Sequence, residues 1–252
     1  MLDGIVTGYE ERFDFPLRDA APERPWLLAS VPRSGSTFVS HLLWATGCLG
    51  APLEYLNFDP AGPYGFASES PMRQVELWRS VVRRRTSPNG VFGLKAFPVQ
   101  LEALHEQNPT LIAEVMRALF PSRSQARVVE LRRRDRTAHA ISYARAILSG
   151  IWRKEQEGEQ RKEPAYAEAA VERAARLIEH QEGAWQAMYR DLRIEPLVVW
   201  YEDAVADADG TIVAVAAHLG VTVDPAAAIA VPQIERQSQV GAQSWAERHA
   251  SR

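Results

Sequence analysis

An apolar run, a loop of small residues and a helical pattern follow one another near the N-terminus, and this stretch constrains the fold most. Residues 25–31 (PWLLASV) have the pattern of a buried strand, the loop Pro32–Thr37 (PRSGST) follows, and residues 38–46 carry apolar side chains at helical spacing. In a strand–loop–helix unit of this kind, the loop amides and the helix N-terminus attract an anion. The stretch therefore predicts an α/β protein with a phosphate-binding loop.

The loop departs from the Walker A sequence of enzymes that hydrolyse ATP or GTP. Gly35 and Thr37 fall where that motif has Gly and Ser/Thr, but Ser36 takes the place of its lysine, and the positive charge comes earlier, from Arg33. Without a lysine to reach a β- or γ-phosphate, nucleotide hydrolysis is disfavoured. An arginine with neighbouring hydroxyl groups suits a 5′-phosphate or a phosphosulfate. The alternative interpretation is an ordinary strand–turn–helix connection.

The composition excludes several classes of protein. The 252 residues are 46% hydrophobic and 24% charged, which is typical of a soluble globular protein with a sizeable core. A net charge of −3 predicts no general affinity for nucleic acid. The single cysteine, Cys48, allows no internal disulfide, and neither a signal peptide nor an apolar run of membrane-spanning length is found. We therefore expect a cytoplasmic protein.

The rest of the chain alternates between strand and helix patterns, which indicates a parallel sheet covered on both faces. Helical patterns separate three further apolar strand segments: 91–95 (VFGLK), 126–131 (ARVVEL) and 195–200 (EPLVVW). The prediction is a single domain over residues 1–252 with a P-loop-type, three-layer α/β fold around a central parallel sheet. Residues 1–25 would form an arm on the surface, and residues 53–85 and 150–192 a helical cap.

Cationic side chains follow two of the predicted strands. Lys95 ends one of them, and Arg132, Arg133 and Arg134 follow the next, just before Asp135, a suitable helix N-cap. Open α/β sheets bind ligands at the carboxyl ends of their strands, and arginines ahead of a helix make an anion site. The sequence therefore predicts a second anion site beside the loop. The alternatives are an exposed lysine at a strand end and a chance basic triplet.

Four blocks of the chain, which together span about residues 26–249, carry a family resemblance: Pro32–Leu56, Pro88–Lys95, Leu131–Ala146 and Glu235–Arg248. In this order they resemble the bacterial PAPS-dependent sulfotransferases of the trehalose 2-sulfotransferase family, where PAPS is 3′-phosphoadenosine 5′-phosphosulfate. The resemblance implies transfer of the sulfuryl group of PAPS to a hydroxyl of a sugar, glycolipid or other small molecule. Adenosine 3′,5′-bisphosphate (PAP) would be the second product.

The resemblance also assigns contacts to the donor. The loop would hold the 5′-phosphosulfate through five residues: Arg33, Ser34, Gly35, Ser36 and Thr37. Ser142 and one arginine would hold the 3′-phosphate, and the trehalose-type pattern favours Arg133 whereas the eukaryotic spacing favours Arg134. Tyr201, which follows the last predicted strand, would lie near the adenine. Arg236, near the C-terminus, could reach the 3′-phosphate or the acceptor.

Glu54 matches the proposed catalytic base of the resembled family. Transfer to an alcohol needs a group that takes the hydroxyl proton, and a carboxylate near the loop can do so. In eukaryotic cytosolic sulfotransferases the base is a histidine two residues after the lysine that ends a strand, and here that position is Phe97. Lys95 and Arg33 would offset the charge on the transferring group and the leaving phosphate. The alternative for Glu54 is a plain surface carboxylate.

No metal is expected. The histidines show no metal-ligand spacing, His139 is interpreted as a helix-face residue, and no acid suited to Mg²⁺ follows the loop and its helix. Two other functions stay open. One is a kinase-like P-loop enzyme, which the missing loop lysine disfavours, and the other is a non-catalytic relative that binds a nucleotide or a glycan.

The acceptor is the least defined part of the prediction. Its contacts would come from loops near residues 57–71 and 150–163, where the resemblance is weakest. Pro32 stands where the trehalose enzymes have a polar residue, so trehalose, another saccharide, a glycolipid or a secondary metabolite all remain open. The resemblance also allows a homodimer, for which the residues themselves give no sign.

Overall fold

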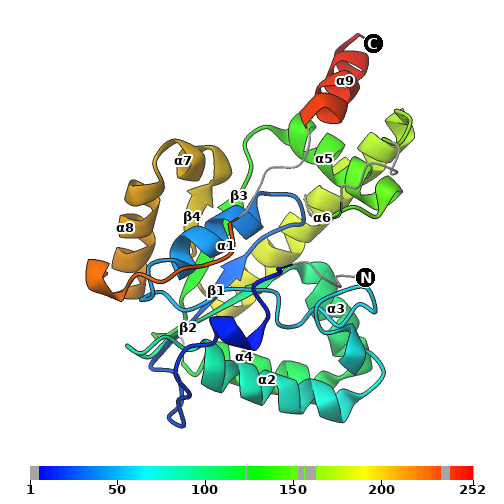
Figure 1. Cartoon of the computed structure of the whole chain (residues 1–252). Helices are drawn as coiled ribbons and strands as arrows, with labels where there is room; N and C mark the ends of the chain where they lie inside the picture. The colour runs from blue at the N-terminus through cyan, green and yellow to red at the C-terminus, as the bar shows by residue number, and fades with distance from the viewer. Residues whose placement is uncertain (1–5, 123, 153–155, 157–162, 234–238, 252) are drawn as a thin grey trace.

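A four-stranded parallel sheet forms the centre of the protein (Figure 1). The computed structural model describes residues 6–122, 124–152, 156, 163–233 and 239–251. Within them the sheet has the order β2-β1-β3-β4, with the strands β1 (Arg24–Ala29), β2 (Val91–Ala96), β3 (Val128–Arg132) and β4 (Leu197–Trp200). The predicted parallel α/β sheet is confirmed, and each strand overlaps the segment expected from its apolar run.

The register of the strands brings their carboxyl ends to one edge of the sheet. Ala29, the last residue of β1, lies opposite Ala96 of β2 and Glu130 of β3, and Arg132 at the end of β3 lies opposite Trp200 of β4. Loops that leave these ends therefore start close together in space, although they are far apart in the sequence. This is the edge where ligands bind in open α/β sheets.

Helices account for most of the remaining structure. Their bounds are α1 (Ser36–Trp44), α2 (Pro71–Arg85), α3 (Pro98–Gln107), α4 (Pro109–Leu119), α5 (Arg136–Ser149), α6 (Glu168–Leu192), α7 (Tyr201–Ala206), α8 (Ala208–Leu219) and α9 (Gln239–Ala250). Short 3₁₀ turns also occur at η1 (Glu11–Phe13), η2 (Gly65–Ala67) and η4 (Pro225–Ala227). The sequence predicts a mainly helical segment over residues 99–120 with a break at Pro109. The break is found there, because Asn108 ends α3 and caps α4 with its side chain.

Some boundaries differ from the predictions. The sequence pattern predicts that the helix after Asp135 continues to Trp152. It ends at Ser149, because Gly150 takes the left-handed conformation (φ 68°) that terminates helices. The sequence also predicts a long amphipathic helix from Pro164 to about Leu192, and the observed helix begins at Glu168. Tyr201, which directly follows the last strand, begins the short helix α7, because no loop separates β4 from α7.

Alternating side chains of the strands enter two separate cores, which gives three layers. One face of the sheet packs against α2, α4 and α6 through side chains that include Leu27, Leu94, Trp78, Leu111 and Trp185. The opposite face packs against α1, α7 and α8 through Trp26, Leu28, Val39, Ala204 and Val215. In Figure 1 these two groups of helices lie on either side of the strands. The three-layer fold is therefore confirmed.

The N-terminal arm is packed more deeply than a surface segment. Phe15 is buried in the same core as α2 and α4, and Thr7 is buried as well. The division of the chain into one domain with a helical cap over residues 53–85 and 150–192 stays a prediction. None of the helices in the described part of the chain is both long and apolar enough to cross a membrane.

Candidate active site

The loop between β1 and α1 has a backbone conformation that its sequence only partly favours. Arg33 (φ 69°) and Gly35 (φ 91°) both lie in the left-handed region, which is unusual for arginine. Gly35 is required here, since a Cβ at this position would lie 2.1 Å from Cδ2 of Tyr201. Gly35 also precedes the first turn of α1, whose amide groups have no partners within the helix and are suited to an anion.

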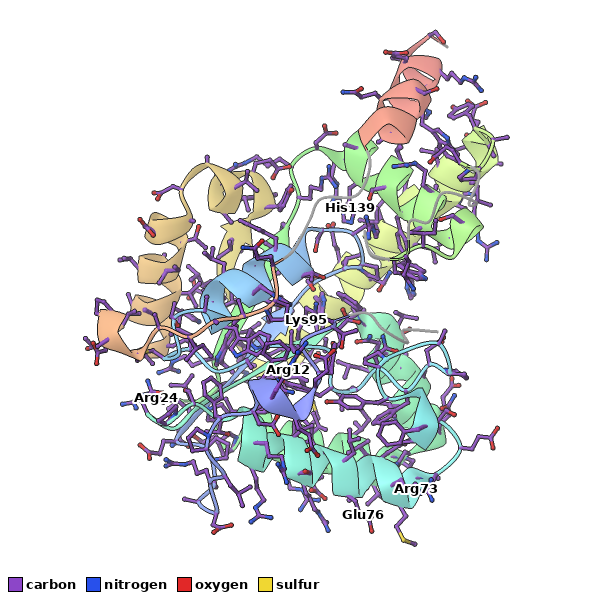
Figure 2. All side chains as sticks on the ribbon, in the orientation of Figure 1. Arg12, Arg24, Arg73, Glu76, Lys95 and His139 are labelled. Carbon is purple, nitrogen blue, oxygen red and sulfur yellow. The ribbon has the colours of Figure 1, made fainter. Side chains whose placement is uncertain are left out.

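A buried histidine on α5 forms a hydrogen bond with this loop. Nε2 of His139 lies 2.8 Å from the carbonyl oxygen of Pro32, and because a carbonyl only accepts, Nε2 carries the proton. Burial lowers the pKa of His139 to about 4, so the ring is neutral at pH 7. Figure 2 labels His139 beside the loop. The sequence had placed it on a helix face, and only the tertiary contact reveals its role in holding the loop.

Lys95 contacts both Glu54 and the helix α1 that follows the loop. Its Nζ lies 3.0 Å from Oε1 of Glu54 and 3.4 Å from Oγ1 of Thr37. The Lys95 side chain is 2% exposed and that of Glu54 is 17% exposed, so neither is an ordinary surface charge. Glu54 is brought here because the preceding residue, Leu53, pairs with Leu94 of β2 and accepts a hydrogen bond from the Lys95 amide at 3.0 Å. Figure 2 shows Lys95 near the middle of the molecule.

Three residues that the sequence analysis did not single out also hold Glu54. Oε2 accepts hydrogen bonds from Nε2 of Gln100 at 3.1 Å and from Nδ2 of Asn57 at 3.2 Å. The amide of Glu54 donates to the hydroxyl of Tyr9 at 3.0 Å. Asn57 could have been suspected from its spacing of three residues, but no local signal marks Tyr9 or Gln100.

A second group of polar side chains lies on the other side of the loop. Nε of Arg33 donates to Oγ of Ser142 at 3.1 Å, and Nη1 of Arg133 donates to the Arg33 carbonyl at 3.3 Å. The Arg133 guanidinium lies 5.4 Å from the ring centre of Tyr201. Nε of Arg133 is buried and has no hydrogen-bond partner among the described residues. A buried donor of this kind is suited to an anionic ligand.

Arg134 is oriented differently from Arg133. Its guanidinium forms a two-pronged ion pair with Asp203, with Nη2 2.8 Å from Oδ2, and lies 4.9 Å from the Trp200 ring centre. The side chain is 49% exposed. The amides of Arg134 and Asp135 both donate to the Glu202 carboxylate. Of the two arginines left open by the sequence, the geometry therefore favours Arg133 as the one that faces the loop.

Comparison with known proteins identifies the family. The family model of the Stf0 sulphotransferases matches residues 25–252. The chain belongs to the Stf0 sulphotransferase family. This membership confirms the resemblance stated from the sequence blocks, and it confirms that the chain is a sulfotransferase.

Individual relatives of this Stf0 chain are distant. It is 26% identical to a trehalose 2-sulfotransferase of Mycobacterium tuberculosis (strain ATCC 35801 / TMC 107 / Erdman), covering 90% of this chain and 94% of the relative. It is 25% identical to that of Mycolicibacterium smegmatis (strain ATCC 700084 / mc(2)155), covering 89% and 93%. Among solved structures, the sulfotransferase domain from the Synechococcus PCC 7002 olefin synthase is 17% identical, with a TM-score of 0.44 over 94% of this chain and 98% of that one.

Of the remaining predicted site residues, some lie in the loop and one lies outside the described residues. Ser34 and Ser36 of the loop are buried, and Oγ of Ser34 has no partner within the described residues. Arg236 lies outside those residues, as does most of the 150–163 loop. From that loop, the Trp152 carbonyl accepts a hydrogen bond from Nη1 of Arg33 at 2.7 Å. The Arg33 side chain therefore points toward Ser142 and Trp152, the side predicted for the 3′-phosphate.

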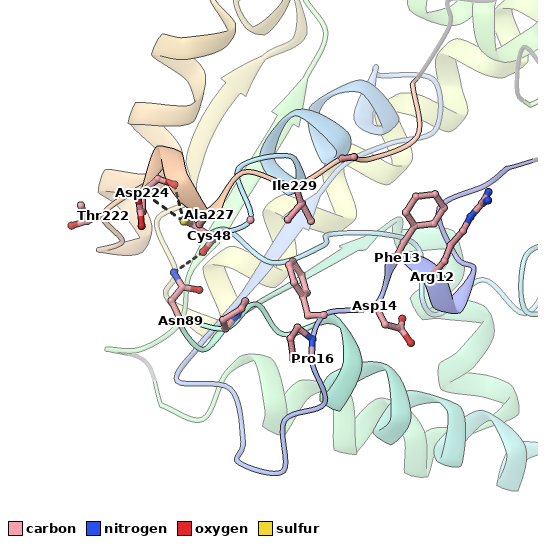
Figure 3. A pocket seen from close by; sticks show the side chains of 14 residues that line it. Arg12, Phe13, Asp14, Pro16, Cys48, Asn89, Thr222, Asp224, Ala227 and Ile229 are labelled. Carbon is pink, nitrogen blue, oxygen red and sulfur yellow. Dashed lines mark hydrogen bonds between the residues drawn. The ribbon is translucent and has the colours of Figure 1, made fainter.

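Two cavities are found, and the second of them reaches Tyr9. One of about 440 Å³ is lined by residues that include Phe13, Cys48, Asn89, Asp224 and Ile229 (Figure 3). The second, of about 480 Å³, lies between the N-terminal arm and α2. Neither is lined by any of the predicted site residues.

Within the described residues no three His, Cys, Asp or Glu side chains gather as a metal site would need, and metal independence stays a prediction.

Proposed function

We propose that this Stf0 sulfotransferase moves the sulfuryl group of PAPS to a hydroxyl of a saccharide or of a molecule that carries one. The observation that supports this most is the pair of polar groups that flank one loop. Arg33, Arg133 and Ser142 lie on one side, and Lys95, Thr37 and Glu54 on the other. PAPS carries phosphate at two positions of one ribose, so it needs two separate anion sites.

The residues present suit this donor. The loop amides, Ser34, Ser36 and Thr37 hold the 5′-phosphosulfate beside Lys95. Arg133 and Ser142 hold the 3′-phosphate, for which the buried and unpartnered Nε of Arg133 is a suitable donor. Tyr201, whose ring packs on Gly35, lies near the adenine. Arg33, which contacts Ser142 through its guanidinium, can serve the 3′-phosphate as well as the leaving group.

The reaction is an in-line displacement at sulfur that resembles phosphoryl transfer. The acceptor oxygen bonds to sulfur while the bond from sulfur to the 5′-phosphate oxygen breaks, and PAP leaves with that electron pair. Glu54 takes the proton of the acceptor hydroxyl. Lys95 and the helix N-terminus offset the negative charge that develops on the leaving phosphate, and they are in place before the reaction begins.

A saccharide acceptor is supported by the relatives, both named trehalose 2-sulfotransferase. At 25–26% identity the acceptor can differ within the class, and Pro32 departs from the polar residue of the trehalose enzymes. We also propose that the protein forms a homodimer, which the family resemblance allows, and that it lies in the cytoplasm, as the sequence predicts.

The test is incubation of the purified protein with PAPS and a panel of acceptors: trehalose, glucose, other disaccharides and a glycolipid. Mass spectrometry would follow the gain of one sulfo group. We expect sulfated product with at least one saccharide, and none when ATP and Mg²⁺ replace PAPS. A phosphorylated product with ATP, and no sulfated product from any acceptor, would favour a kinase-like enzyme instead.

A further inference from the structure

The N-terminal arm lies ahead of the region that the family model matches, yet it contacts the proposed base. The matched region begins at residue 25, whereas Tyr9 accepts a hydrogen bond from the Glu54 amide at 3.0 Å. The two residues are 45 positions apart in the sequence. The contact therefore depends on how the arm folds back over the sheet.

The arm is fixed in place by Arg85, at the end of α2. Its guanidinium donates to the carbonyl groups of Gly8 at 2.9 Å, Glu10 at 3.2 Å and Phe13 at 3.4 Å. It also forms an ion pair with Asp14 at 2.8 Å, and the side chain is only 2% exposed. A buried guanidinium is tolerated when its donors are satisfied, and here the arm itself satisfies them. Loss of Arg85 would leave these carbonyl groups without their donor.

The position of the Tyr9 hydroxyl is determined from two sides. On the backbone side, the Glu10 carboxylate accepts hydrogen bonds from the amides of Thr7 at 2.7 Å and Gly8 at 2.8 Å. On the ring side, Tyr9 packs edge to face against Tyr64 with 5.4 Å between ring centres, and against Tyr55 with 6.2 Å. Contacts other than the one to Glu54 therefore hold both the backbone and the ring of Tyr9.

Glu54 needs such a constraint because it belongs to neither a helix nor a strand. The single bridge between Leu53 and Leu94 aligns the residue before it, and the Glu54 amide is bonded to Tyr9. A carboxylate that removes a proton in the transition state must be held to within a fraction of an ångström of its productive position. The backbone of Glu54 sets where its side chain begins.

We propose that the N-terminal arm is a working part of the active site, in which Tyr9 is a positioning residue for Glu54 and Arg85 holds Tyr9 in place. This inference rests on the proposed function, since it takes Glu54 as the base. It extends the catalytic unit to a segment outside the region that the family model matches.

The direct test is Tyr9→Phe, which removes only the hydroxyl. We expect kcat to fall about tenfold, because the Glu54 amide loses its partner. The affinity for PAP and the melting temperature should stay at the wild-type values. Hydrogen exchange at the Glu54 amide should accelerate, and this readout does not depend on activity. Tyr189→Phe is the matched control, because its buried hydroxyl has no partner within the described residues, and it should change none of these quantities.

A second pair of variants on α2 tests the support of the arm. Arg85→Met should accelerate exchange of the Glu54 amide and lower kcat, while Arg85→Lys should recover part of both. Arg79→Met is the control, since Arg79 is exposed and pairs with Glu114 away from the arm. PAP binding by each variant verifies that the loop is still folded.

The outcomes separate this inference from the proposed function. Wild-type kcat in Tyr9→Phe, with or without faster exchange, would overturn the positioning role of Tyr9. Unchanged exchange at Glu54 in both Tyr9→Phe and Arg85→Met would overturn the structural basis of the inference. If the wild-type protein transfers no sulfuryl group from PAPS, the proposed function fails, and the exchange data still decide whether the arm fixes Glu54.

Discussion

Glu54→Gln should lower kcat by a factor of about 10²–10⁴ and leave the affinity for PAP within about twofold of wild type. The amide has nearly the same shape as the carboxylate, but it cannot take a proton from the acceptor hydroxyl. Glu54→Asp keeps the carboxylate and shortens its reach by one methylene, so its kcat should lie between those of the wild type and Glu54→Gln. The measurement is the steady-state rate with PAPS and the best acceptor, beside calorimetric titration with PAP.

The control for this prediction is another ion-paired glutamate of similar exposure. Glu182 is paired with Arg136, and its side chain is 16% exposed, against 17% for Glu54. Glu182→Gln makes the same substitution at a side chain that is bonded to Arg136 and not to the loop, so kcat should stay near the wild-type value. A wild-type rate in Glu54→Gln would show that the proton goes elsewhere.

Arg133→Ala should raise the Kd for PAP by about 10- to 100-fold, the cost of a lost charge-assisted hydrogen bond. Binding of 5′-AMP, which has no 3′-phosphate, should change much less. The reason is geometric, because Arg133 contacts the Arg33 carbonyl and the Tyr201 ring, and its buried Nε has no hydrogen-bond partner among the described residues. Titration calorimetry with the two nucleotides measures the difference directly.

Arg134→Ala serves as the matched control, since it removes the neighbouring guanidinium. Arg134 is engaged by Asp203, so PAP affinity should fall less than about twofold. The reverse pattern, in which Arg134→Ala weakens PAP selectively and Arg133→Ala does not, would place the 3′-phosphate on the other arginine. If neither variant changes the affinity for PAP, the 3′-phosphate is bound away from the end of β3.

Much of the fold could be predicted because local patterns and tertiary structure agree. The apolar run at β1 is buried on both faces, so the sequence shows it as a continuous hydrophobic segment. Helix signals such as the Asp135 cap act within one turn and are visible in the sequence. The loop Pro32–Thr37 could be recognised for the same reason, since its composition and its neighbours occur in one short stretch.

The parts of the site that were missed depend on contacts between distant segments. Tyr9, Gln100 and His139 act through bonds to Glu54 or Pro32 that join segments 45, 46 and 107 residues apart. The choice between Arg133 and Arg134 is of the same kind, because Asp203 of α7 engages one of them and leaves the other beside the loop. Sequence spacing alone could not distinguish two adjacent arginines whose difference lies in their neighbours.

The central claim is that one crevice holds both phosphate-bearing positions of PAPS, and the melting temperature of the wild-type protein with different nucleotides tests it most directly. At about 100 times its Kd, PAP should stabilise the fold by about 2.7 kcal/mol, which corresponds to a rise of about 5–10 °C for a chain of this size. ATP at the same concentration has no 3′-phosphate and should leave the melting temperature near that of the free protein. Equal shifts with PAP and ATP would contradict the account.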